Sequence, residues 1–309
     1  MILALPNQVR EVLTKLNLRG YSAYIHGECV RMMITGQTPL DFDVMSDAEP
    51  KRIQAVFEHK PVPGFVRVTS YCDADEKAAL ARGKTFTFDA IGYGLKAGTN
   101  DRNSERERER DWLMLDPWNG EDALRNSLPV LLPDRTPESA RHADIAVILL
   151  WKSISDVLAQ CDALFTALLP ELGMLDGELL EVTRKSVGYS SPILELRYAL
   201  LFCQLGKPDC HSRTPDGRDL YHGHAERSRI YASRIMKRLG CPDELRLRVE
   251  DIIKAYEKVQ YADEADITRL SESYSADELK TLWLFNSALS RANSDEKSAM
   301  MYKKRAKGL

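Results

Sequence analysis

The chain has 309 residues, of which 44% are hydrophobic and 29% are charged, and its net charge is -3 with a pI of about 6.1. This composition is typical of an ordinary globular protein. No stretch approaches the roughly 18 uninterrupted apolar residues that cross a bilayer. The first residues lack the basic segment of a signal peptide, and the six scattered cysteines include no CxxC pair. We therefore expect a cytoplasmic protein with reduced thiols, no membrane segment and no zinc site.

Helix and strand patterns alternate over the first 135 residues. Apolar residues recur with helical spacing over 7–17, and a glycine follows that segment. A short helix is expected over 29–35. Runs with strand character occupy 21–27, 40–46, 64–71 and 84–94. Strands and helices mixed in this order predict an α/β head over residues 1–135, within an α+β chain.

The character of the sequence changes after this region. Residues 99–111 are polar and charge-dense, which is typical of a solvated loop or an exposed helical extension. From residue 137 on, helical periodicity dominates, so we expect a helical neck over 136–190 and a helical body over 191–309. The basic tail over 295–309 is expected to be frayed. The candidate helices cover 138–159, 163–172, 176–186, 192–204, 224–239, 242–260, 264–271 and 276–292.

The strongest chemical signal is a pair of aspartates on the second predicted strand. Asp41 and Asp43 are two positions apart, so they would project from one face of a strand, about 7 Å apart along the backbone. Two such carboxylates suit Mg²⁺, which prefers a few carboxylates together with substrate phosphates. Gly27, after the first predicted strand, and the helix that follows would offer N–H groups to a triphosphate. Taken alone, the two acids fit a solvent-facing edge strand better than a metal site.

The flanking sequence makes the pattern of the two aspartates more specific. The stretch "GECVRMMITGQTPLDFDV" resembles the nucleotidyltransferase motif of class II of the CCA-adding enzyme and poly(A) polymerase superfamily. That motif runs roughly from a strand through G-G-x-V-R-D to L-x-G-R-x-P-x-D-x-D. The residues that match are Gly27, Val30, Arg31, Gly36, Pro39, Asp41 and Asp43. The resemblance implies that Gly27 and Arg31 position a nucleoside triphosphate and that Asp41 and Asp43 hold Mg²⁺.

The stretch also departs from the family motif at three positions. Glu28 replaces the second glycine, Met32 replaces the aspartate after the arginine, and Gln37 replaces the second arginine. Glu28 adds bulk and negative charge next to the expected triphosphate, where glycine would let the backbone approach closely. A working enzyme requires either that the Glu28 side chain swings away or that it joins the metal site. In an inactive protein, the same residue would block nucleotide binding.

Two alignments compete for the family's R-R-D-x-x-x-N segment, which contacts ribose and triphosphate. In the first, "TFTFDAIGYG" takes its place, with Thr85 for the acid and Asp89 for the asparagine. In the second, Arg110 and Asp111 are the remnant of R-R-D, and Asp89 lies on the third strand as an additional carboxylate. The downstream text "LMLDPWNGEDALRN" resembles the segment that closes the family's head.

A base-reading motif, E-D-x-x-R, follows in the first helix after the head of family members. The nearest text is "PESARHAD", in which Glu138 and Arg141 are one helical turn apart. An ordinary surface ion pair at a helix start explains this pair equally well.

The body resembles the HD-type domain that some CCA-adding enzymes carry. Text such as "LGKP", "DG" and "GH" matches, but Phe202 and Cys203 stand where the family has its metal-binding His-Asp pair. Phenylalanine cannot bind a metal, so we expect a helical scaffold without phosphohydrolase activity. Arginines and lysines over 227–238, together with His222 and His224, form a basic cluster that suits either RNA phosphates or a solvated helix face.

The resemblance implies a template-independent nucleotidyltransferase. A 3′-hydroxyl, by resemblance that of a tRNA, would attack the α-phosphate of CTP or ATP and release pyrophosphate, so that CCA or part of it is added. Mg²⁺ would be the cofactor. Two alternatives stay open: a catalytically inactive RNA-binding protein, and a nucleotidyltransferase that acts on another acceptor.

Overall fold

The computed structural model defines two compact units, Met1–Thr136 and Pro137–Leu309. The first unit ends one residue beyond the predicted head, whereas the predicted neck and body fall within a single unit. Among the described residues, no helix is both long enough and apolar enough to cross a membrane. The structure describes residues 3–72, 74–97, 112–126, 128–136, 140, 142–151, 154, 157–158, 162–260, 262 and 264–308.

The first unit is built on a five-stranded sheet with the order β3-β2-β1-β4-β5. β2 and β3 are parallel, and the other neighbouring strands are antiparallel. Three of the four predicted strands are found close to their expected bounds. The strands are β1 (Ala23–His26), β2 (Phe42–Ser46), β3 (Val66–Ser70), β4 (Gly92–Leu95) and β5 (Trp112–Leu115).

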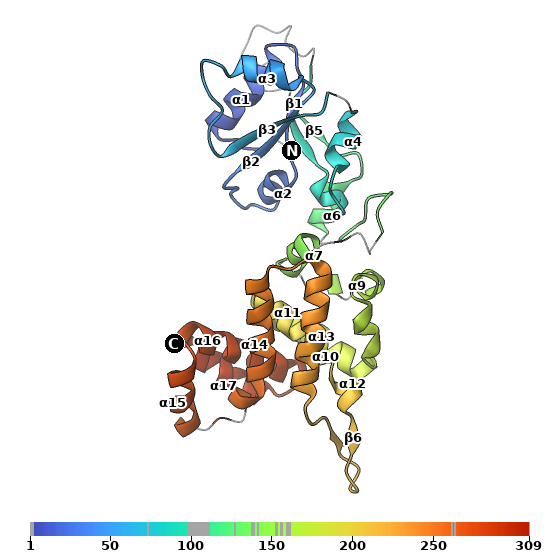
Figure 1. Ribbon diagram of the computed structural model, residues 1–309, viewed down its shortest axis with the longest axis vertical. Helices are drawn as coiled ribbons and strands as arrows, with labels where there is room; N and C mark the ends of the chain where they lie inside the picture. The colour runs from blue at the N-terminus through green and yellow to red at the C-terminus, as the bar shows by residue number, and fades with distance from the viewer. Residues whose placement is uncertain are drawn as a thin grey trace. The chain divides into compact units, whose positions relative to one another are not determined.

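Helices cover the sheet of this unit. The predicted first helix is confirmed as α1, whose apolar face of Val9, Val12, Leu13 and Leu16 is buried. α1 packs on β1, β2 and β4, and α3 lies beside it (Figure 1). On β2, Met45 joins Tyr24 and Leu80 in a buried apolar cluster. The helices are α1 (Asn7–Asn17), α2 (Glu28–Ile34), α3 (Pro50–Val56), α4 (Glu76–Ala81) and α6 (Gly120–Arg125).

The fourth predicted strand, over 84–94, is only partly correct. Its second half forms β4, but Thr87–Asp89 forms the 3-10 helix η1, and Phe86 makes only an isolated bridge to Leu131. Alternation of apolar and polar residues does not distinguish a continuous strand from a strand interrupted by a tight turn. Asp89 therefore lies on a turn ahead of β4, and its expected position on a strand is wrong.

In the part of the second unit that the structure describes, the only strands are a small hairpin of β6 (Ser212–Arg213) and β7 (Asp219–Leu220), and the regular elements are otherwise helical. The predicted α+β class, with a mixed head and a helical body, is confirmed. The predicted helices over 224–239 and 276–292 have the observed bounds. The helical elements are α7 (His142–Leu149), α9 (Asp162–Leu168), η4 (Pro170–Met174), α10 (Gly177–Tyr189), α11 (Leu194–Phe202), α12 (Lys207–Cys210), α13 (His224–Leu239), α14 (Asp243–Gln260), α15 (Glu264–Ser273), α16 (Ala276–Ala292) and α17 (Glu296–Lys307).

The basic tail is ordered, so the expectation that it frays is wrong. It forms α17, which packs along α16 (Figure 1). The Tyr302 ring is buried and stacks on Trp283 at 5.8 Å between centroids, and its hydroxyl donates to the Gln260 carbonyl at 2.7 Å. Asp295 caps the helix by accepting from the Ser298 N–H at 3.0 Å. Five lysines and arginines among twelve residues obscured this single buried stripe in the sequence.

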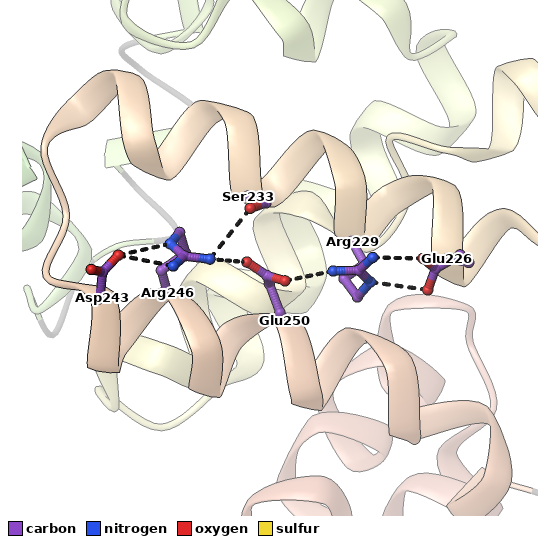
Figure 2. Close-up of polar contacts among 6 residues, drawn as sticks. All are labelled: Glu226, Arg229, Ser233, Asp243, Arg246 and Glu250. Atoms are coloured by element: carbon purple, nitrogen blue, oxygen red, sulfur yellow. Dashed lines mark hydrogen bonds and ion pairs between the residues drawn. The ribbon is translucent and has the colours of Figure 1, made fainter.

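A chain of charged side chains joins α13 to α14. Glu250, which is buried, accepts from Arg229 on one side and from Arg246 on the other, each at 2.6 Å (Figure 2). Arg229 also binds Glu226, and Arg246 also binds Asp243. A buried carboxylate is tolerated only when it is paired in this way. Arg229 therefore fastens the helix pair instead of presenting a free charge to solvent.

A second buried charge, Arg197 on α11, forms hydrogen bonds with the C-terminal ends of two other helices. Its guanidinium donates to the carbonyls of Leu149 and Trp151, at the end of α7, and to Ser190, at the end of α10. The side chain is only 2% exposed. A helix C-terminus carries partial negative charge, so these carbonyls can stabilise the positive charge of the guanidinium.

Candidate nucleotidyl-transfer site

The two aspartates lie side by side at the beginning of β2. Asp41 immediately precedes the strand, and Asp43 is its second residue. Both carboxylates contact one side chain, that of Arg67 on β3, which confirms that they share a face. The Arg67 Nε donates to Asp43 Oδ1 at 2.9 Å, and its Nη2 lies 3.5 Å from Asp41 Oδ2. The next residue on the same face of β2, Met45, is buried in the apolar cluster. The two acids therefore lie at the edge of the apolar core.

Gly27 forms the sharp turn between β1 and α2. Its φ of 72° is a conformation that side chains disfavour, which explains the glycine at this point. The Gly27 N–H donates to the Ile91 carbonyl at 3.3 Å, so it is engaged within the protein. N–H groups of the first turn of α2 lack partners within the helix by geometry, and they follow directly after the turn.

Arg31 on α2 binds two acids. One nitrogen, Nη1, pairs closely with Asp89 on η1, and the other, Nη2, lies 3.0 Å from Glu28 Oε1. The Arg31 and Asp89 side chains are each 11% exposed, whereas that of Glu28 is 69% exposed. The Glu28 side chain therefore turns along its own helix toward Arg31. Asp89, predicted as a possible further carboxylate of the metal site, has Arg31 as its partner.

The "LDPWNG" segment fixes the turn that carries Asp89. Asp116 accepts from the Gly120 and Glu121 N–H groups at 2.7 and 2.9 Å and so caps α6. A Cβ at Gly120 would lie 2.3 Å from the Thr87 carbonyl oxygen, so only glycine permits α6 to approach η1 this closely. The segment that resembles the end of the family's head thus supports the ion pair of Arg31.

Lys84 belongs to the site, although it was not among the candidates chosen from the sequence. A Cβ built on Gly27 would lie 3.0 Å from the Lys84 Nζ, so the ammonium rests against the turn. The charge of the Lys84 ammonium also affects the neighbouring His26. The pKa of His26 is lowered to about 4, chiefly by burial and then by Lys84, while the Asp43 carboxylate acts in the opposite direction. Position 84 directly precedes Thr85 of the first alignment, and this adjacency was the only available signal.

Several predicted residues cannot be placed. Arg110, Asp111, Glu138 and Arg141 all lie outside the described residues. The second alignment and the base-reading pair therefore stay predictions.

The structure does bring together most of the other predicted residues. Gly27, Arg31 and Asp89 lie on one side of the candidate site, and Asp41 and Asp43 lie on the other. Lys84 and Arg67 lie beside them.

The acid pair has the chemistry that a divalent cation needs, because both carboxylates are accessible and already hold a cationic group between them. Among the described residues, no group of three or more His, Cys, Asp or Glu side chains is arranged to hold a metal ion. A divalent cation held by two carboxylates has further positions that substrate oxygens and water can fill.

The residues of the HD-like signature serve the core of the body. Phe202 and Cys203 are fully buried, and burial raises the pKa of the Cys203 thiol to about 12. His224 is also buried, and its ring nitrogens lie 2.7 Å from the Tyr221 carbonyl and 2.7 Å from the Tyr256 hydroxyl. In the basic cluster, Arg227 pairs with Asp209 and Arg238 pairs with Glu171.

Comparison with known proteins gives partial sequence matches. No family model matches the chain. Poly(A) polymerase I of Haemophilus influenzae is 43% identical over 49 residues, which cover 16% of this chain and 11% of that polymerase. The enzyme of Salmonella typhi is 41% identical over 49 residues, 16% of this chain and 10% of the polymerase. The predicted resemblance to the poly(A) polymerases is confirmed for this segment.

Solved structures overlap loosely with the whole chain. A tRNA-processing enzyme in an apo form is 13% identical over 99% of each chain, with a TM-score of 0.49. A tRNA nucleotidyltransferase complexed with a primer tRNA and an ATP analogue is 14% identical over 96% of this chain and 98% of that chain, with a TM-score of 0.47. The CCA-adding enzyme of Bacillus stearothermophilus, in complex with CTP, is 15% identical over 99% of this chain and 84% of that chain, with a TM-score of 0.40.

Proposed function

We propose that this chain is a metal-dependent nucleotidyltransferase that extends an RNA 3′ end. The observation that carries the proposal is the placement of Asp41 and Asp43 side by side on the sheet. The same sheet has Gly27 in its β1–α2 turn, Arg31 on α2 and the Lys84 ammonium against that turn. The match to poly(A) polymerases supports the same reaction class.

In the proposed reaction, the RNA 3′ oxygen bonds to the α-phosphorus, the bond from that phosphorus to the bridging oxygen breaks, and pyrophosphate leaves with the electron pair. The hydroxyl proton passes to solvent. Asp41 and Asp43 would hold Mg²⁺, which when bound neutralises charge on the phosphates and favours ionisation of the hydroxyl. Gly27 and the start of α2 would receive the triphosphate. The ammonium of Lys84 would offset part of its negative charge.

The nucleotide and acceptor follow from the resemblance. We propose CTP or ATP as substrates and a tRNA 3′ end as the first acceptor to test, with CCA or part of it as the product. Glu138 and Arg141 would read the base, and Arg110 and Asp111 would contact the triphosphate. The protein would act without a membrane and in the cytoplasm.

One observation favours a second function, an RNA-binding protein without catalysis. Arg31, which would position the triphosphate, is held by both Asp89 and Glu28. This trio carries a net negative charge, which opposes a triphosphate. An inactive protein would keep such an arrangement because it never binds nucleotide.

The two functions separate in a transfer assay. Wild-type protein is incubated with α-labelled CTP or ATP, Mg²⁺ and tRNA that lacks its 3′ CCA, in parallel with an unrelated RNA and with no RNA. The proposal predicts label in the tRNA band and release of pyrophosphate. Label in the unrelated RNA alone would revise the acceptor. RNA binding without incorporation of either nucleotide would favour the inactive protein.

A further inference from the structure

One arginine contacts both carboxylates on which the proposed metal site depends. Arg67 is paired with Asp43 in the parallel ladder of β2 and β3, so their side chains project from the same face by the register of the sheet. Its Nε lies 2.9 Å from Asp43, and its Nη2 lies 3.5 Å from Asp41. The backbone register therefore places the Arg67 side chain beside both acids.

The contact is also easy to break. The Arg67 side chain is 67% exposed, and those of Asp41 and Asp43 are 65% and 39% exposed. Exposed ion pairs contribute little to stability, because water and salt screen them. β3 stands at the edge of the sheet, so its long side chain can leave the acids without disturbing a neighbouring strand.

We propose that Arg67 is a displaceable internal cation of the acid pair. It occupies Asp41 and Asp43 before substrate arrives, and a divalent cation must compete with it. A free divalent cation gains only the two carboxylates. It also displaces the Arg67 guanidinium, which then lies without these partners next to the positive charge of the metal. A cation that arrives with a nucleoside triphosphate also brings phosphate oxygens, which a guanidinium binds well. Arg67 thereby favours the metal–nucleotide complex over the free metal.

This inference rests on the proposed metal site, and it identifies Arg67 as a positioning residue. It predicts opposite effects on two binding reactions when the charge is removed. Without Arg67, free metal meets less competition and less repulsion, so its binding tightens. The metal–nucleotide complex loses a phosphate contact, so its binding weakens. A purely structural role for Arg67 would not move the two affinities in opposite directions.

The test uses Mn²⁺ alone, counted by electron paramagnetic resonance, and then Mn²⁺ with a non-hydrolysable ATP analogue, measured by calorimetry. The proteins are the full-length wild type, Arg67→Gln, Asp43→Asn and a charge-matched control, Arg52→Gln, at an exposed position on α3. We expect Arg67→Gln to bind free Mn²⁺ about tenfold more tightly and the metal–nucleotide complex several-fold more weakly. Arg52→Gln should resemble wild type.

The outcomes separate the two levels of the account. If Asp43→Asn loses Mn²⁺ while Arg67→Gln binds it as wild type does, the metal site stands and the role of Arg67 is overturned. If Arg67→Gln weakens both affinities, Arg67 supports the site and does not compete for it, which also overturns the inference. If no protein binds Mn²⁺ with or without nucleotide, both the inference and the proposed function fail.

Discussion

At the scale of single residues, Glu28 is the most informative departure from the family motif. Its carboxylate turns toward Arg31, so the bulk expected over the triphosphate lies along the helix instead. This arrangement agrees with the first of the two possibilities open to a working enzyme. The sequence indicated the conflict, but it did not show that the carboxylate would pair with an arginine three residues later.

Replacing Glu28 should therefore improve nucleotide binding. Glu28→Gly removes a negative charge near the triphosphate and releases one side of Arg31, so we expect the KM for nucleotide to fall about fivefold with little change in kcat. Glu28→Gln is the control, because it removes the charge and keeps the bulk. Steady-state kinetics measure both constants. A collapse of kcat in either variant would instead place Glu28 in the metal site.

Lys84 and His26 offer a readout of the site that needs no substrate. If the Lys84 ammonium lies beside His26, Lys84→Met should raise the pKa of His26, although burial will keep it below its ordinary value of 6.5. An NMR titration of the His26 ring measures this directly. A pKa identical to that of wild type would remove Lys84 from this position.

The same histidine sets a direction for stability against pH. The folded protein leaves His26 neutral down to about pH 4, whereas the unfolded chain protonates it from about pH 6.5 downward. Protons thus favour the unfolded state in this window, and stability contributed by neutral His26 falls as the solution is acidified.

At the scale of elements, the buried Arg197 should be among the most sensitive positions of the body. Burial lowers its pKa to about 10, so it stays charged at neutral pH, and it binds the ends of α7 and α10. Arg197→Met keeps much of the volume and removes every donor, leaving several carbonyls unpaired. We expect a loss of about 3 kcal/mol in urea unfolding. The exposed Arg234→Met should lose less than about 0.5 kcal/mol, and equal losses would contradict this account.

The network between α13 and α14 should respond to acid. Burial raises the pKa of Glu250, but hydrogen bonds from Ser233, Arg246 and Arg229 outweigh it, so the pKa lies below the ordinary 4.5. A lowered folded-state pKa means that the stabilisation is complete above about pH 4.5 and is lost as the pH falls through the folded value. The difference in unfolding free energy between wild type and Glu250→Gln should shrink from pH 6 to pH 3. A difference that does not change with pH would show that the charge of Glu250 is unimportant.

At the scale of the whole molecule, sequence reasoning predicted the order of structures better than the partners of side chains. Periodicity gave the bounds of α13, which has one buried stripe, and of α16, which is buried over a wider face. It failed at η1 and at α17, where a turn and a high density of charge interrupt or obscure the pattern.

In the candidate site, too, local sequence patterns predicted some relations, whereas contacts made by the tertiary structure could not be predicted. Spacing alone placed Asp41 and Asp43 on one face, since a strand fixes that relation locally. Arg67 and Lys84 could not be found in this way, because strand register and a tight turn bring them to the acids and to Gly27 from 24 and 57 positions away. The modest net charge of -3 likewise gave no indication that several arginines of the body are neutralised in pairs.

The most direct test of the central claim is the rate of nucleotide incorporation by three proteins under identical Mg²⁺ and RNA conditions: wild type, Asp43→Asn and Asp122→Asn. The last makes the same chemical change at an exposed position on α6 of the same unit. Loss of a metal-binding carboxylate should lower turnover about a thousandfold, or about 4 kcal/mol of transition-state stabilisation, while Asp122→Asn keeps wild-type turnover. Equal incorporation by Asp43→Asn and wild type would contradict the assignment of the acid pair as the catalytic centre.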